Sequence, residues 1–110
     1  MTPGHYDSFA DILPSSRGYF LSEVQLDIAT PTTAIFKAKL NGPAGSPVWA
    51  RAWLSTEEGT LAESASPQME AGDEVTLEVK LRSSESPQSA YMRIESTPLH
   101  TEHVVGVKLA

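Results

Sequence analysis

The clearest structural signal in this chain lies in ten consecutive residues, Gly72-Asp73-Glu74-Val75-Thr76-Leu77-Glu78-Val79-Lys80-Leu81. From Val75 onward every second residue is aliphatic, and the residues between are Thr, Glu and Lys. This period of two places the aliphatic side chains on one face of a β-strand and the polar ones on the other. Gly72-Asp73 is a turn signal before the strand. A strand with one apolar face needs a second layer to cover that face.

Further segments of strand character occur on both sides of this run. Their residue ranges are 20–28, 32–40, 47–55, 60–64, 89–96 and 102–109. In the first of them Phe20, Val24 and Leu26 share one face and Leu21 lies on the other. About seven strands, separated by turns and without a long helical pattern, predict an all-β fold. The expected architecture is an antiparallel two-sheet sandwich.

The N-terminal segment has a different character from the rest of the chain. We expect residues 1–18 to form an N-terminal arm and residues 19–110 to form the sandwich domain. Within the arm, residues 7–13 have the pattern of about two helical turns, which is too short for a stable isolated helix. The arm is therefore expected to dock loosely on the sandwich, or to order against a partner subunit.

Composition limits the classes of function. The chain has 110 residues, 8 basic and 14 acidic side chains and a formal net charge of -6, which argues against a nucleic acid or an anionic membrane as the main partner. No apolar run approaches the ~18 residues of a membrane span. There is no cysteine, and hence neither a disulfide framework nor a thiolate metal site. Residues 1–7 do not resemble a signal peptide, which favours a cytoplasmic location but leaves the compartment open.

The most unusual local feature is the segment Val48-Trp49-Ala50-Arg51-Ala52-Trp53-Leu54. In one interpretation this strand buries at least one tryptophan in the core, and Arg51 extends its charge to the edge. In the other, the Val, Ala and Leu residues face the core and a Trp49–Arg51–Trp53 row faces solvent. Tryptophan and arginine are enriched at binding hot spots, and exposed indole rings also stack on sugars. The sequence leaves both interpretations open.

Groups that could carry catalysis or bind a metal are few. His100, Glu102 and His103 form the only cluster of metal-ligand types, but a strand would point His100 and His103 in opposite directions. The acidic residues fall mainly in turns and on polar strand faces, and no nucleophile elbow or phosphate loop occurs. We therefore expect a protein that is not an enzyme and that uses no cofactor and no metal.

The order of the strands and the Gly72-Asp73 turn before an alternating strand resemble bacterial immunoglobulin-like or fibronectin type III-like modules, over about residues 19–110. Tyr91 opens the penultimate strand, where such folds often carry a corner tyrosine. The resemblance implies an immunoglobulin-like sandwich that binds, spaces or decorates. No pair of cysteines marks an antibody-type domain.

These observations lead to one main expectation for function. It is a non-enzymatic protein-interaction or structural module, an accessory subunit of a larger assembly such as a surface, virion or secretion complex. Its partner would be another protein or a further copy of itself, because the edge strands of a sandwich readily pair with other strands. The alternative is a carbohydrate-binding domain that uses the Trp-Arg-Trp strand face. The candidate binding residues are Trp49, Arg51, Trp53 and Tyr91.

Overall fold

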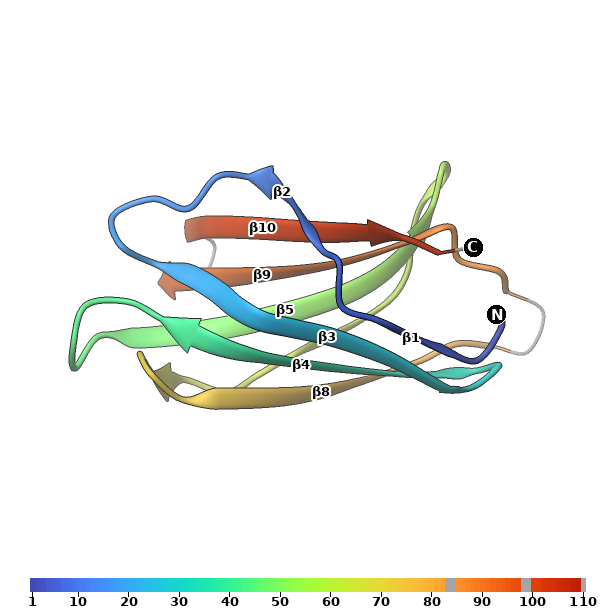
Figure 1. Ribbon diagram of the computed structural model, residues 1–110, viewed down its shortest axis with the longest axis horizontal. Helices are drawn as coiled ribbons and strands as arrows, with labels where there is room; N and C mark the ends of the chain where they lie inside the picture. The colour runs from blue at the N-terminus through green and yellow to red at the C-terminus, as the bar shows by residue number, and fades with distance from the viewer. Residues whose placement is uncertain (83–84, 98–99, 110) are drawn as a thin grey trace.

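The computed structural model describes residues 1–82, 85–97 and 100–109, and every helix or strand in this part of the chain is a β-strand. The strands form two antiparallel sheets that face each other (Figure 1). The predicted all-β fold, an antiparallel two-sheet sandwich, is confirmed. The seven expected strands are present, together with three short strands that the sequence did not predict.

Four strands form the first sheet, in the order β1-β3-β4-β8. Their bounds are Gly4–Tyr6 for β1, Phe20–Thr30 for β3, Thr33–Asn41 for β4 and Glu74–Lys80 for β8. The alternating run of the sequence is β8, and its side chains follow the predicted period of two. Val75, Leu77 and Val79 are buried, whereas the residues between them are exposed.

The second sheet is built around β5, which pairs with β9 on one side and with β6 and β7 on the other. Its strand order is β2-β10-β9-β5-β6, and we call it the six-stranded sheet because it includes β7. The bounds are Ala10–Leu13 for β2, Pro47–Thr56 for β5, Gly59–Ala65 for β6, Met69–Glu70 for β7, Ser89–Thr97 for β9 and His100–Lys108 for β10.

The inner faces of the two sheets form one apolar core. Its largest apolar side chains, each less than 2% exposed, are Leu26, Phe36, Leu40, Leu54, Met92, Ile94, Val48 and Val79. Burying one such side chain stabilises the fold by about 1.5–3 kcal/mol. Alanines of β4, β5 and β9 lie between these larger residues, and small residues of this kind let the two sheets interdigitate at the density of a protein interior.

Strand β3 departs from the predicted face pattern. Leu21 is only 6% exposed, whereas Phe20 is 42% exposed. The register with β4 shifts around Glu23, whose φ of 54° lies in the left-handed region. This β-bulge adds one residue to β3, so the residues before it turn to the opposite face. The prediction that Phe20 shares a face with Leu26 is therefore wrong.

The N-terminal arm forms two short strands rather than helical turns. Strand β1 pairs with β3 and strand β2 pairs with β10, so the arm crosses from the four-stranded sheet to the six-stranded sheet (Figure 1). The helical interpretation of residues 7–13 is wrong, because the free edges of β3 and β10 offer backbone hydrogen bonds that an isolated helical turn lacks. The boundary between an arm (1–18) and a domain (19–110) stays a prediction.

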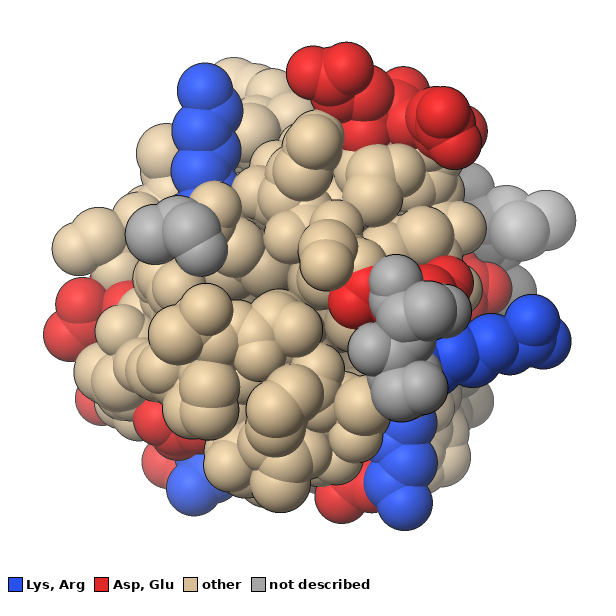
Figure 2. Space-filling model, turned by 90° about the vertical axis from the view of Figure 1, so that its right-hand side faces the viewer, with Lys and Arg blue, Asp and Glu red and all other residues tan. Residues whose placement is uncertain are grey.

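The N-terminus and the end of β10 lie at the same end of the sandwich, on the right in Figure 1. The terminal amino group of Met1 donates a hydrogen bond to the carbonyl of Pro31, at 3.1 Å. Figure 2 looks onto this end, where uncharged side chains fill most of the surface and charged ones of both signs lie mainly towards the rim.

A helix long and apolar enough to cross a bilayer is not found among the described residues.

Candidate functional site

Strand β5 decides between the two interpretations of the tryptophan segment. The side chains of Val48, Ala50, Ala52 and Leu54 are completely buried in the core. The residues between them point away from the core and are partly exposed. The interpretation that buries a tryptophan in the sandwich core is therefore wrong, and the Trp49–Arg51–Trp53 row lies on the outer face of the six-stranded sheet.

The pairing of β5 with β9 adds three further residues to this row. Trp53 is opposite Tyr91, Arg51 is opposite Arg93, and Trp49 is opposite Glu95. We call the set Trp49, Arg51, Trp53, Tyr91 and Arg93 the tryptophan face. The four candidate residues of the sequence analysis thus lie together on one surface. Arg93 and Glu95 were missed, although they follow Tyr91 at a spacing of two and so share its face.

Aromatic contacts hold part of the tryptophan face rigid. The rings of Trp53 and Tyr91 stack, with centroids 5.4 Å apart and planes inclined by 24°. The guanidinium carbon of Arg93 lies 5.7 Å from the centroid of Trp53, within the range of a cation–π interaction. A Cβ atom at Gly106 would lie 2.6 Å from the Tyr91 ring, so glycine leaves the space that this ring occupies on β10. The aromatic pair is therefore fixed from both sides.

A buried carboxylate lies beside the two arginines. Arg51 and Arg93 are directly opposite each other, an arrangement of like charges that is unfavourable by itself. An Oε1 atom of Glu95, whose side chain is 2% exposed, lies 3.5 Å from Nε of Arg51 and 3.7 Å from Nε of Arg93. These are ion-pair distances rather than good hydrogen bonds. Glu63 of β6 approaches Arg51 to 3.7 Å from the other side. The carboxylates offset the repulsion while both arginine side chains stay more than a quarter exposed.

An apolar groove of about 280 Å³ continues the tryptophan face towards the arm. It runs along β2, β10 and β9, with Ile12 and Tyr91 among its lining residues and Lys108 at the end of β10. Ile12 is 59% exposed, the highest value among the large apolar side chains described. The outer surface of this sheet therefore offers aromatic, aliphatic and cationic groups side by side.

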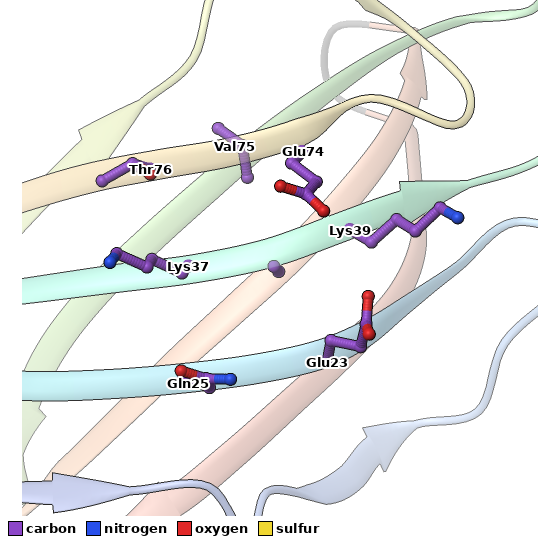
Figure 3. Close-up of a pocket in the computed structure, with 8 residues that line it drawn as sticks. Glu23, Gln25, Lys37, Lys39, Glu74, Val75 and Thr76 are labelled. Carbon is purple, nitrogen blue, oxygen red and sulfur yellow. The ribbon is translucent and has the colours of Figure 1, made fainter.

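The outer face of the four-stranded sheet has a different chemistry (Figure 3). Lys37 and Lys39 of β4 lie between acidic and polar side chains of β3 and β8, around a shallow pocket of about 200 Å³. The labelled side chains from the flanking strands include Glu23, Glu74 and Thr76. Alternating charges of this kind are typical of a solvated strand face. The two outer faces of the sandwich are therefore chemically distinct.

A second polar cluster centres on Glu102 of β10, whose side chain is fully buried. Its carboxylate accepts hydrogen bonds from Ser16, from Ser96 at 2.8 Å and from the guanidinium of Arg17. Nε2 of His100 lies 3.2 Å away. The Arg17 hydrogen bond is the main cause that lowers the pKa of Glu102 from 4.5 to about 2. An ionised carboxylate with this many donors acts as a structural clamp.

The turn before β3 aims Arg17 at this clamp. Arg17 and Gly18 have φ values of 52° and 81°, and the N–H of Tyr19 donates to the carbonyl of Ser16 at 3.0 Å. Two successive positive φ angles define a type I′ turn. The N–H of Ser16 also donates to the carbonyl of Glu102 at 3.1 Å. The loop between β2 and β3 is therefore fastened to the start of β10 by backbone and side chain together.

The residues that the sequence suggested as metal ligands have other partners. His103 is 5% exposed, and its Nδ1 accepts the N–H of Leu21 at 3.0 Å. Its Nε2 lies 2.8 Å from a carboxylate oxygen of Asp11. Because Nδ1 is an acceptor, Nε2 carries the proton and donates to Asp11. In the described part of the chain, no group of three or more His, Asp or Glu residues is arranged to hold a metal ion.

Comparison with models of known protein families finds no match for this chain, and comparison with curated proteins finds none either.

Proposed function

We propose that the protein is a non-enzymatic interaction module that binds a partner protein through the tryptophan face. The observation that carries the proposal is the orientation of β5, which turns both tryptophans of the chain and Arg51 away from a core that is complete without them. Trp, Tyr and Arg are the residue types that dominate binding energy at protein interfaces. These residue types are concentrated on the outer face of the six-stranded sheet, whereas the outer face of the four-stranded sheet carries Lys, Glu and Thr. This difference favours a dedicated binding surface on the six-stranded sheet.

The rigidity of the aromatic pair supports this proposal. Binding normally costs about 0.5–1.5 kcal/mol for each flexible side chain that it immobilises. Trp53 and Tyr91 are already stacked in the free protein, and Arg93 is already positioned over the indole. A partner that docks here would therefore lose little side-chain entropy at these residues.

The resemblance to immunoglobulin-like modules is part of the proposal. When β3, β4, β5, β8, β9 and β10 are lettered A, B, C, E, F and G, the sheets read A-B-E and C-F-G. These pairings agree with those of immunoglobulin-like sandwiches. Such domains bury a tryptophan of strand C, whereas the tryptophans of β5 face outward. This departure supports a binding role for them, in an accessory subunit of a larger assembly.

The carbohydrate alternative has less support from the geometry. A sugar ring stacks on an open face of an aromatic ring. Trp53 is already in contact with the Tyr91 ring and with the guanidinium of Arg93. A partner protein can use the edges of these rings together with the guanidinium groups, whereas a stacked sugar needs a free ring face.

The test inserts a photo-crosslinking amino acid at position 49, on the tryptophan face, and at position 35 as a control. Ile35 is also a partly exposed residue of a central strand, but it lies on the outer face of the other sheet. In an extract of the source cells, we expect the probe at position 49 to form a defined adduct with one protein. The additional substitution Arg93→Ala should abolish this adduct, and the probe at position 35 should not form it. Equal labelling at both positions, or none at position 49, would refute the proposal. A blue shift of tryptophan fluorescence with a glycan panel would favour the carbohydrate alternative instead.

A further inference from the structure

Strand β8 is an edge strand with unusual regularity. It is the last strand of the four-stranded sheet, and its seven residues pair with β4 without any shift of register. Among the described edge strands, β1 has three residues, β2 has four with a register shift, and the pairing of β6 also shifts. Short or irregular edges protect a sandwich from further pairing, whereas a long and regular edge invites it.

The backbone groups at the free edge of β8 can be identified from the hydrogen bonds at its two ends. The N–H of Leu40 donates to the carbonyl of Asp73 at 2.9 Å, and the N–H of Leu81 donates to the carbonyl of Thr32 at 2.8 Å. In an antiparallel ladder, bonded residues alternate with residues whose groups point the other way. Odd-numbered residues of β8 therefore bond to β4. The N–H and C=O groups of the four even-numbered residues, Glu74, Thr76, Glu78 and Lys80, point to the open edge.

We propose that a second copy of this chain pairs on this edge, with the two β8 strands antiparallel and Leu77 at the two-fold axis. This register places Thr76 opposite Glu78 of the partner subunit and Glu74 opposite Lys80 of the partner subunit. All of these are even-numbered residues, so each pair exchanges both of its backbone bonds. The strands would form about eight hydrogen bonds between the two copies. The occupant of the edge is thus the protein itself, and this inference does not depend on the proposed function.

The register with Leu77 at the axis is the one that pairs β8 over all seven of its residues, and in it the charges of β8 are complementary to themselves. Centring the axis on Thr76 would place Glu74 opposite Glu78 of the partner subunit, and centring it on Glu78 would place two copies of Glu78 together. Like charges directly opposite each other are unfavourable, whereas opposite charges stabilise. With Leu77 at the axis, two Glu74–Lys80 pairs form and no like charges are opposed. Glu74 would then lie between Lys80 of the partner subunit and Lys39 of its own β4 strand.

The geometry of the pair has a consequence for the other sheet. A two-fold axis between antiparallel strands of one sheet is perpendicular to that sheet, so the joined sheet has eight strands with the same face outward in both copies. The six-stranded sheets then lie on one side of the dimer. Both tryptophan faces would point to that side, which provides two equivalent surfaces and the avidity of a bivalent binder. The neighbouring edge strand β6 carries small or polar side chains apart from Leu61.

The experiment measures dimer dissociation by sedimentation from about 10 µM to about 1 mM protein. Glu74→Lys and Lys80→Glu each bring like charges together twice, and we expect the dissociation constant to rise roughly 10- to 30-fold in each variant. The double variant exchanges the two charges and should recover the affinity. An equimolar mixture of the two single variants should form heterodimers, because the lysines at positions 74 and 80 of one variant would then face the glutamates at positions 80 and 74 of the other. A monomer throughout the concentration range would overturn the proposal, as would a dimer that Glu74→Lys leaves unchanged.

Two controls separate the edge contact from general effects. Glu58→Lys makes the same charge change in the exposed turn between β5 and β6, and should leave the dissociation constant unchanged. Thr76→Pro removes an N–H that faces the open edge and leaves the bonds to β4 intact. It should abolish the dimer while the melting temperature of the monomer stays near that of the parent. A Thr76→Pro variant that remains folded and dimeric would also overturn the proposal.

Discussion

Replacing Glu102 with Gln removes the charge of the buried clamp while keeping its shape. The carboxylate is fully buried and accepts from Arg17, Ser16 and Ser96, whereas the Arg17 side chain is 61% exposed. An amide in this place retains one acceptor oxygen but turns an NH₂ group towards a cation and hydroxyl donors. The substitution therefore removes a charge-assisted network without opening a cavity.

The expected loss of stability follows from the burial of the two partners. Hydrogen bonds to a charged group contribute about 1.5–3 kcal/mol, and the charge that the substitution leaves behind, on Arg17, is exposed to solvent. Loss of the charge-assisted bonds that Glu102 accepts is therefore expected to cost about 2–3 kcal/mol. The entropy of unfolding for 110 residues is about 0.23 kcal/mol/K, from about 2.1 cal/mol/K for each residue. We therefore expect the melting temperature of Glu102→Gln to fall by about 9–13 °C at neutral pH.

The effect of this substitution depends on pH in a defined direction. The pKa of Glu102 falls from 4.5 to about 2 in the folded protein, chiefly because Arg17 bonds to the ionised form. The folded protein therefore binds this proton more weakly than the unfolded chain does. The carboxylate stabilises the fold above pH 4.5, and this stabilisation is lost as the pH falls from 4.5 to about 2. The difference in melting temperature between parent and variant should narrow over that range.

Thermal unfolding followed by circular dichroism at about pH 7, 4 and 3 measures both effects. Other carboxylates titrate equally in parent and variant, so their contributions cancel in the difference. Glu63→Gln is the matched control, because the Glu63 side chain is 55% exposed and its pair with Arg51 is long at 3.7 Å. It should change the melting temperature by less than about 2 °C. A fall of less than about 3 °C for Glu102→Gln, or a difference that is independent of pH, would refute the reasoning.

Three further substitutions test other parts of the structure. Gly106→Ala places a Cβ atom 2.6 Å from the Tyr91 ring, and denaturant unfolding should show a loss of about 1–3 kcal/mol with a weaker near-UV signal from the aromatic stack. Glu23 has a left-handed φ, and Glu23→Gly relieves about 1–2 kcal/mol of backbone strain because glycine adopts this conformation freely. Glycine also loses more backbone entropy on folding, at a cost of about 0.5–1 kcal/mol, so the free energy of unfolding measured with denaturant should rise slightly. His103→Phe leaves the buried N–H of Leu21 without its acceptor and should lower the free energy of unfolding by about 1–3 kcal/mol. An unchanged midpoint of denaturant unfolding would contradict this expectation.

Much of the fold could be predicted because strand patterning is local. The run from Val75 to Leu81 alternates so strictly that its burial follows directly from the geometry of an extended chain. The same logic failed at β3, because a bulge at Glu23 reverses the face of every residue before it. A bulge needs one residue with an unusual φ, and glutamate gives no sign of it in the sequence. The arm was misjudged as helical for a related reason, since its strands exist only through the edges that they pair with.

The candidate site could be predicted in part. The spacing of two identified Trp49, Arg51 and Trp53 as one side of a strand, but both sides of that strand were plausible core faces. Arg93 and Glu95 joined the site through the pairing of β5 with β9, which connects residues about forty positions apart. The clamp at Glu102 joins segments that are still more distant along the chain, and no short motif marks it.

The sequence by itself determined the seven longer strands, the turns between them, and which side chains of each regular strand share a face. These properties depend on the alternation of neighbouring residues and on turn-forming residues, both of which are local. Only the tertiary structure decided which face of β5 became the inside. The alanine-containing face packs densely between the sheets, and the larger tryptophans remain outside, because the space between two packed sheets is fixed at about 10 Å. That choice belongs to both sheets together, so it could not be read from either strand alone.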